Sequence, residues 1–142
     1  MDQCEYTELL HSLLETPSLE QFLAEHENEF RTEGMAELLL AVLKEKGLSK
    51  AALARRSYTS EVYLHQVISG RRSPSRDRLL CLCLGLECEL AQVQEMLRRC
   101  GYSTLYVRDK RDAILLYCGM HHKTVLETND LLDRFGELAL IR

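Results

Sequence analysis

The sequence predicts an all-α protein, and three observations point to this fold class. Its 142 residues include only two prolines and seven glycines, so few positions would interrupt a helix. Apolar residues recur three and four positions apart along most of the chain, which is the spacing of amphipathic helices. Serine, threonine and glycine residues stand where such helices would begin and end. A chain of this length can also bury a substantial core.

Two short helices are predicted at the N-terminus. The first spans residues 4–15. Its apolar stripe consists of Tyr6, Leu9, Leu10, Leu13 and Leu14. The second begins at Ser18, which forms a capping-box pattern with Gln21. Its inward side chains are expected to be Leu19, Phe22 and Leu23. Residues 1–46 carry 11 acidic and 3 basic side chains, so we expect residues 1–32 to form an acidic N-terminal helical extension.

Residues 47–75, GLSKAALARRSYTSEVYLHQVISGRRSPS, predict two short helices joined by a tight turn. Ser49 is placed to cap the first helix, and Thr59 or Ser60 is placed to cap the second. Gly70 supplies the stop signal of the second helix. Two basic residues and a proline then close the unit. Two helices joined by three or four residues indicate a helix-turn-helix.

This stretch resembles the helix-turn-helix of the lambda-repressor and Cro type, in the xenobiotic-response-element (XRE) class of regulators. The residues that carry the resemblance follow one another without a gap. They are Gly47, Leu48, Ser49, Leu53, Ala54, Ser57, Ser60, Tyr63, Leu64, Val67, Gly70, Arg71, Arg72, Pro74 and Ser75. With its flanking helices the resemblance covers about residues 33–97, and it implies a five-helix, lambda-repressor-like bundle.

The flanking segments complete this bundle. Residues 33–46, EGMAELLLAVLKEK, form the helix before the motif, and Gly47 stops it. Residues 75–86 and 89–100 are expected to be the fourth and fifth helices. We therefore assign residues 33–101 to one helix-turn-helix DNA-binding domain.

Beyond this domain the chain repeats itself at an offset of 35 residues. Arg76-Asp77-x-Leu79-Leu80-x-x-Cys83 reappears as Arg111-Asp112-x-Ile114-Leu115-x-x-Cys118. The fixed offset predicts a duplicated helix pair, 76–101 and 111–136. Because two helices cannot bury an apolar face alone, the second pair is expected to pack on the first. The seam is expected to contain Ile114, Leu115, Val125, Leu131 and Leu132. Residues 102–142 would then form a C-terminal helical hairpin.

The charge distribution favours a nucleic-acid partner for the motif. The whole chain has a net charge of −4, yet residues 47–86 carry seven basic and two acidic side chains. A positive segment on an acidic chain suits phosphate binding. An ordinary solvated basic surface would have the same composition, and this stays an alternative.

The resemblance implies which residues contact double-stranded DNA. In that family the second motif helix, here residues 60–69, lies in the major groove. The residues expected to reach base edges are Ser60, Glu61, Val62, His65 and Gln66. Those expected to bind phosphate are Ser49, Lys50, Arg71 and Arg72. The amide of Gln66 can pair with adenine through both its donor and its acceptor. Tyr58 stands where the family usually has glycine, and a left-handed backbone there would cost roughly 1–2 kcal/mol.

Other chemistries are poorly represented in the sequence. It contains no glycine-rich phosphate loop, no His-Glu-x-x-His and no nucleophile elbow, so we expect neither catalysis nor a cofactor. The six cysteines lack the paired C-x-x-C spacing of a zinc site, so we expect no metal and interpret them as small buried residues. The N-terminus lacks a secretory signal, and no stretch is long and apolar enough to span a membrane. We therefore expect a cytoplasmic protein.

Together these observations predict a sequence-specific DNA-binding transcriptional regulator, and the resemblance implies that it acts as a homodimer. The alternative is a non-catalytic protein-interaction adaptor that reuses the same fold. Such an adaptor would bind its protein partner through the acidic N-terminal helices or the C-terminal helix pair.

Overall fold

The computed structural model describes residues 3–27 and 34–141, and within these residues the secondary structure consists of helices alone. The predicted all-α class is thereby confirmed. The chain divides into two compact units, Met1–Thr32 and Glu33–Arg142. Each unit is described by itself.

The first unit contains α1 (Gln3–Glu15) and α2 (Leu19–Glu25). Phe22 of α2 is buried, but Leu19 and Leu23 are exposed. The expectation that all three point inward was therefore wrong. Much of the apolar stripe of α1 is exposed as well. The physical reason is size, because two helices this short cannot enclose a core of their own.

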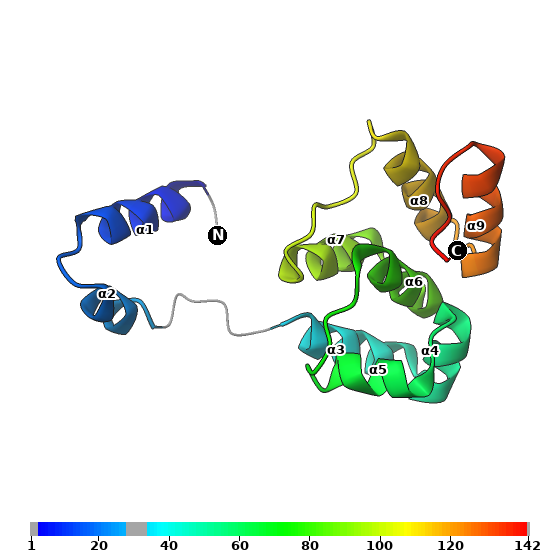
Figure 1. The fold of residues 1–142 in the computed structure, drawn as a ribbon, viewed down its shortest axis with the longest axis horizontal. Helices are drawn as coiled ribbons and strands as arrows, with labels where there is room; N and C mark the ends of the chain where they lie inside the picture. The colour runs from blue at the N-terminus through cyan, green and yellow to red at the C-terminus, as the bar shows by residue number, and fades with distance from the viewer. Residues whose placement is uncertain (1–2, 28–33, 142) are drawn as a thin grey trace. The chain divides into compact units, whose positions relative to one another are not determined.

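The second unit holds the helix-turn-helix bundle and the C-terminal extension. Its described helices are α3 (Met35–Lys46), α4 (Lys50–Ser57), α5 (Glu61–Ile68), α6 (Arg76–Leu86), α7 (Leu90–Arg99), α8 (Lys110–Met120) and α9 (Val125–Arg134). Figure 1 shows α3, α4 and α5 on one side of the α6–α7 pair, and α8 and α9 on the other side. The α6–α7 pair therefore lies between the motif and the extension.

Helix α6 is the centre of this unit. Seven of its eleven residues are buried, which is typical of a helix surrounded by others. Helix α4 approaches it closely at Gly85. A Cβ atom at this position would lie 3.2 Å from Leu53 Cδ1 and 3.3 Å from the backbone nitrogen of Ser57. Because Gly85 has no side chain, α4 can pack closely on α6, and the motif is thereby held against the core.

The predicted helix caps are present in the motif. The Oγ atoms of Ser49, Ser60 and Ser75 each accept a hydrogen bond from the backbone N–H three residues further on, at 3.0, 3.0 and 3.2 Å. Helix α3 ends at Gly47 in the left-handed conformation. Helix α4 ends in the same conformation at Tyr58, with φ 57° and ψ 39°. The turn keeps its left-handed residue although tyrosine occupies the place of glycine.

Replacing Tyr58 by glycine is expected to stabilise the protein. The left-handed backbone costs tyrosine roughly 1–2 kcal/mol, and the greater freedom of glycine in the unfolded chain returns about 0.4–1 kcal/mol of that. A net gain of about 1 kcal/mol should raise the melting temperature by a few degrees. Thermal unfolding followed by circular dichroism checks this, with Tyr106→Gly as a control at another exposed tyrosine. A lower melting temperature for Tyr58→Gly would show that the ring contributes more than the backbone strain costs.

The structure confirms that the C-terminal helices duplicate the pair before them. Helices α7 and α9 are offset by 35 residues at both ends. The residues with left-handed backbone after these helices show the same offset of 35. Glu87 and His122 correspond, with φ values of 52° and 51°. Gly101 and Gly136 also correspond, with φ values of 78° and 76°. Backbone conformation, and not only sequence, is therefore repeated.

Reciprocal ion pairs join the two helix pairs. The guanidinium group of Arg76 donates two hydrogen bonds of 3.2 Å to the carboxylate of Asp112. Its counterpart Arg111 donates two hydrogen bonds of 2.9 and 3.2 Å to Asp77. The Arg-Asp dipeptide of each repeat thus forms ion pairs with the Arg-Asp dipeptide of the other repeat. Reciprocity of this kind is the mark of an isologous, two-fold interface, which here is formed within one chain.

In each repeat, one side-chain amide forms hydrogen bonds with the extended segment that follows the helix pair. Gln94 accepts a hydrogen bond from the N–H of Leu105 at 2.8 Å and donates to its carbonyl oxygen at 3.0 Å. Asn129 accepts from the N–H of Leu140 at 2.8 Å and donates to the carbonyl oxygen of Ile141 at 3.3 Å. The duplication therefore extends beyond the helices into the extended segments that cover them.

Most of the residues that were predicted to form the seam lie there. Leu115, Val125 and Leu132 are buried in the common core, and Ile114 packs against it. Leu131 is the exception, because it lines a groove on the outside of α8 and α9. Adjacent helical residues point about 100° apart, and Leu132 holds the inward position.

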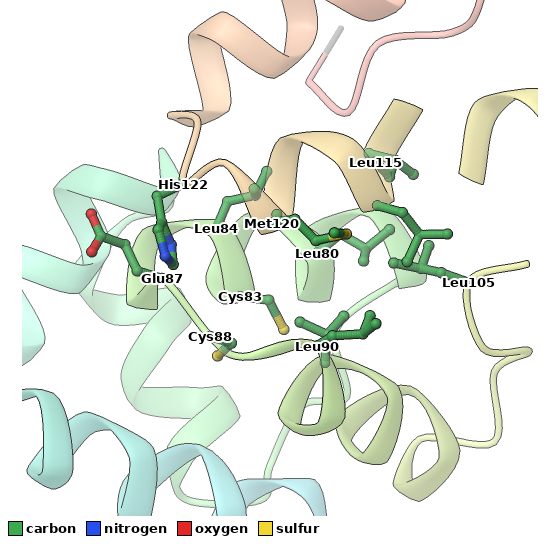
Figure 2. A pocket seen from close by; sticks show the side chains of 13 residues that line it. Leu80, Cys83, Leu84, Glu87, Cys88, Leu90, Leu105, Leu115, Met120 and His122 are labelled. Carbon is green, nitrogen blue, oxygen red and sulfur yellow. The ribbon is translucent and has the colours of Figure 1, made fainter. Parts of the chain in front are cut away.

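The seam also encloses a small apolar cavity of about 30 Å³ (Figure 2). Leucine, methionine and cysteine side chains from α6, α7 and α8 form most of its wall, and Glu87 and His122 also line it. This volume is about that of a single water molecule, and the apolar walls offer water few hydrogen-bond partners. It is far below the roughly 300–1,000 Å³ of ordinary ligand pockets.

Candidate nucleic-acid interface

Helix α5 buries one face and exposes the other. Leu64 and Val67 are buried against the core of the bundle, as the sequence predicted. Glu61, Val62 and His65 are exposed. Val62 is 68% exposed, so this apolar side chain has no packing role within the described residues.

Two other predicted base-reading residues lie at the ends of the exposed face. Ser60 is the N-cap of α5 and is exposed, with its Oγ accepting the N–H of Tyr63. Gln66 is half-buried, not fully exposed as expected. The five candidate base-reading residues thus lie along one short helix and its N-cap, and Gln66 is the least exposed of them.

The basic pair Arg71-Arg72 is anchored to the end of α5. The backbone N–H groups of both arginines donate to the carbonyl oxygen of Gln66, at 3.0 and 3.1 Å. Ser69 Oγ donates to the same oxygen at 3.1 Å. Gly70 makes this possible by adopting a φ of 80°, which other residues rarely do. Both arginine side chains remain exposed, so the backbone of the pair is fixed while the charges face solvent.

Tyr63 positions two guanidinium groups beside α5. The Cζ atoms of Arg72 and Arg78 lie 5.2 and 5.1 Å from the centre of its ring, within the range of a cation–π interaction. Burial raises the pKa of the Tyr63 hydroxyl, and the two guanidinium groups only partly oppose this. Arg78 was not among the residues predicted to bind phosphate. The signal was present, since it belongs to the same basic segment.

The remaining predicted phosphate-binding residues lie at the start of α4. Ser49 caps this helix, and Lys50 is its first residue and is exposed. A helix N-terminus carries partial positive charge and favours an anion. Arg55 and Arg56, at the other end of α4, line a separate open cleft of about 450 Å³ together with His122 and Lys123. The nine predicted DNA-contacting residues thus lie in α4, in α5, at the N-caps of these two helices and in the loop after α5.

Most of the cysteines that the structure describes lie in the core. Cys81, Cys83, Cys88 and Cys118 are buried, and burial raises the pKa of the Cys81 thiol to about 11. The thiolate, which is the reactive and metal-binding form, is therefore disfavoured there. Among the described residues, no group of three or more His, Cys, Asp or Glu side chains could hold a metal ion.

Over residues 3–27 and 34–141, no helix combines the length and the apolar character needed to cross a bilayer.

Comparison with known proteins identifies the bundle. The helix-turn-helix family model matches residues 39–93, which extend from within α3 into α7. The match contains both motif helices and all nine predicted contact residues. No curated protein and no solved structure matches the chain. Residues 39–93 are thus similar to the helix-turn-helix family, which supports the predicted resemblance to DNA-binding domains of this kind.

Proposed function

We propose that this protein is a sequence-specific regulator of transcription that binds double-stranded DNA in the cytoplasm and catalyses no reaction. One observation carries the proposal above others. The exposed face of α5 belongs to a segment with exposed basic side chains, namely Lys50 at the start of α4 and Arg71-Arg72 after α5, and the carbonyl oxygen of Gln66 holds the backbone of the arginine pair. Basic side chains in the same segment as an exposed helix suit the phosphates that border a major groove.

In this proposal the contacts have two different tasks. Ser49, Lys50, Arg71 and Arg72 bind phosphate, which sets the position of the domain without reading sequence. The base-reading residues are Ser60, Glu61, Val62, His65 and Gln66. Gln66 pairs with adenine and Val62 contacts a thymine methyl group. Arg78 joins the phosphate-binding set because it shares the Tyr63 ring with Arg72.

We further propose that two copies bind a two-fold-related site. A single α5 can contact only a few base pairs, whereas two half-sites one helical turn apart, about 34–36 Å, provide a useful operator length. Symmetric association also doubles the number of phosphate contacts, on which affinity largely depends.

Replacing Gln66 by alanine is expected to reduce sequence discrimination with little effect on general affinity. The backbone carbonyl that anchors Arg71 and Arg72 remains, so the basic loop should keep its position. Loss of the bidentate amide should cost roughly 1–3 kcal/mol on the preferred duplex, mostly at one base pair. The preferred duplex is first selected from a random pool with the parent protein. Parent and variant are then titrated against it and against a scrambled duplex.

Gln21→Ala, which removes an exposed amide from α2, is the matched control and should behave as the parent. Equal affinity of the Gln66→Ala variant and the parent for both duplexes would remove Gln66 from the base-reading set. If no duplex is enriched and none is bound even at low salt, the adaptor function replaces DNA binding.

A further inference from the structure

The open cleft at the end of α4 brings together basic side chains from distant parts of the chain. Its volume of about 450 Å³ lies within the roughly 300–1,000 Å³ of ordinary ligand pockets. Arg55 and Arg56 belong to the last turn of α4, and Lys123 lies between α8 and α9. Glu87 is the only acidic residue among the described residues that line the cleft. Three cations and one carboxylate give its wall an excess of positive charge.

The two arginines carry most of this charge. Both are exposed, and among the described residues neither takes part in an ion pair. Lys123 contributes less, because it also acts on Glu127 beside it. Hydrogen bonds from Thr124 lower the pKa of the Glu127 carboxyl group most, and Lys123 lowers it further. Arg55 and Arg56 are therefore the groups most available to an anion.

The residues that end three helices at this cleft have an unusual backbone. Tyr58, Glu87 and His122 follow α4, α6 and α8, and all three line the cleft. Their φ values are 57°, 52° and 51°, and no other described residue except glycine has a positive φ. The described glycines with positive φ lie outside the wall of the cleft, and they are Gly47, Gly70, Gly101 and Gly136.

This distribution indicates a functional surface. Left-handed backbone suits glycine, and a side chain there costs stability. Residues held in such conformations cluster at ligand-binding and active sites. The cleft therefore presents a phenol, a carboxylate and an imidazole where a helix end alone would favour glycine. Figure 2 shows two of these side chains, Glu87 and His122, where they also border the seam cavity.

We propose that this cleft binds a small molecule that carries phosphate groups. The guanidinium groups of Arg55 and Arg56 donate paired hydrogen bonds to the phosphate oxygens, and Lys123 adds a third positive charge. The ring of Tyr58, which is 48% exposed, offers an apolar surface to the organic part of the ligand. None of the nine residues predicted to contact DNA lines this cleft, so the site is separate from the proposed DNA interface.

Isothermal titration calorimetry of the full chain with sodium pyrophosphate, at low salt and without DNA, tests this site. The parent should bind pyrophosphate. Arg55→Ala/Arg56→Ala should weaken binding at least about tenfold, because hydrogen bonds between charged groups are lost. Glu87→Gln should strengthen binding several-fold, because it removes a like charge from the cleft. Arg98→Ala/Arg108→Ala removes two exposed arginines elsewhere, and this matched control should bind as the parent does.

Thermal unfolding without pyrophosphate separates loss of binding from loss of folding. If Arg55→Ala/Arg56→Ala melts much earlier than the parent, Arg55→Gln/Arg56→Gln, which keeps longer side chains, replaces it. A parent that binds no pyrophosphate would overturn the proposal, and the arginines would then only offset the negative end of α4. Equal binding by the parent and the arginine variant would overturn it as well.

Two further outcomes would also contradict a small-molecule site. Equal losses in the arginine variant and the control, with no gain in Glu87→Gln, would show that pyrophosphate responds only to net charge. A parent without pyrophosphate binding, whose arginine variant has a smaller salt slope on random duplex DNA, would assign these cations to DNA. Because the calorimetry contains no DNA, its failure is distinct from failure of the proposed function, which titration with duplex DNA measures.

Discussion

Replacing Leu115 by aspartate is expected to lower the free energy of unfolding by roughly 3–5 kcal/mol. Leu115 is buried at the seam between the two helix pairs and lines its small cavity. A carboxylate at this place would lose its hydration, and no lysine or arginine is among the described residues that line the cavity. A loss of this size is a large part of the total stability of a domain, about 5–15 kcal/mol. The variant should therefore aggregate or unfold at moderate temperature.

Urea unfolding followed by circular dichroism measures this loss, and light scattering detects aggregation. Leu126→Asp, at an exposed position of α9, controls for the added charge and should stay within about 0.5 kcal/mol of the parent. If Leu115→Asp is as stable and monodisperse as the parent, α8 and α9 do not pack on the bundle, and the duplicated arrangement is wrong.

Much of the fold could be predicted because its signals are local. Serine residues at helix starts and glycines at helix ends fixed the boundaries of the motif helices to within one or two residues. The 35-residue offset was visible because Arg-Asp and the apolar positions behind it recur in order. Local chemistry of this kind determines where a helix begins and ends, whatever it later packs against.

Features that depend on packing between distant segments were not predictable in the same way. Leu131 was placed at the seam, because an apolar residue on an amphipathic helix does not reveal which of two partners it faces. Nothing in the Arg-Asp repeat indicated that its copies would exchange ion pairs. The position of Arg78 beside the Tyr63 ring, and so next to Arg72, could not be predicted from the sequence. Side-chain contacts across the bundle decide these points, and each depends on the fold as a whole.

The nine predicted DNA-contacting residues remain predictions, although they occupy α4, α5 and the following loop as expected. Of the substitutions at these residues, replacing both Arg71 and Arg72 by alanine should reduce DNA affinity the most. Each lost phosphate contact should lower the slope of log affinity against log salt concentration by about 0.9. Affinity at low salt should fall on the order of tenfold for each contact. The loss should be similar on every duplex, because phosphate contacts carry no sequence information.

The most direct measurement is a titration of the parent and the Arg71→Ala/Arg72→Ala variant with random duplex DNA at two salt concentrations. Arg98→Ala/Arg108→Ala removes the same charge from exposed positions of α7 and the loop after it, and serves as the matched control. We expect salt-dependent binding by the parent and the control. For the Arg71→Ala/Arg72→Ala variant we expect a slope smaller by about 1.8. Equal binding and equal slopes for all three proteins would contradict the claim that this helix-turn-helix docks on DNA through the loop after α5.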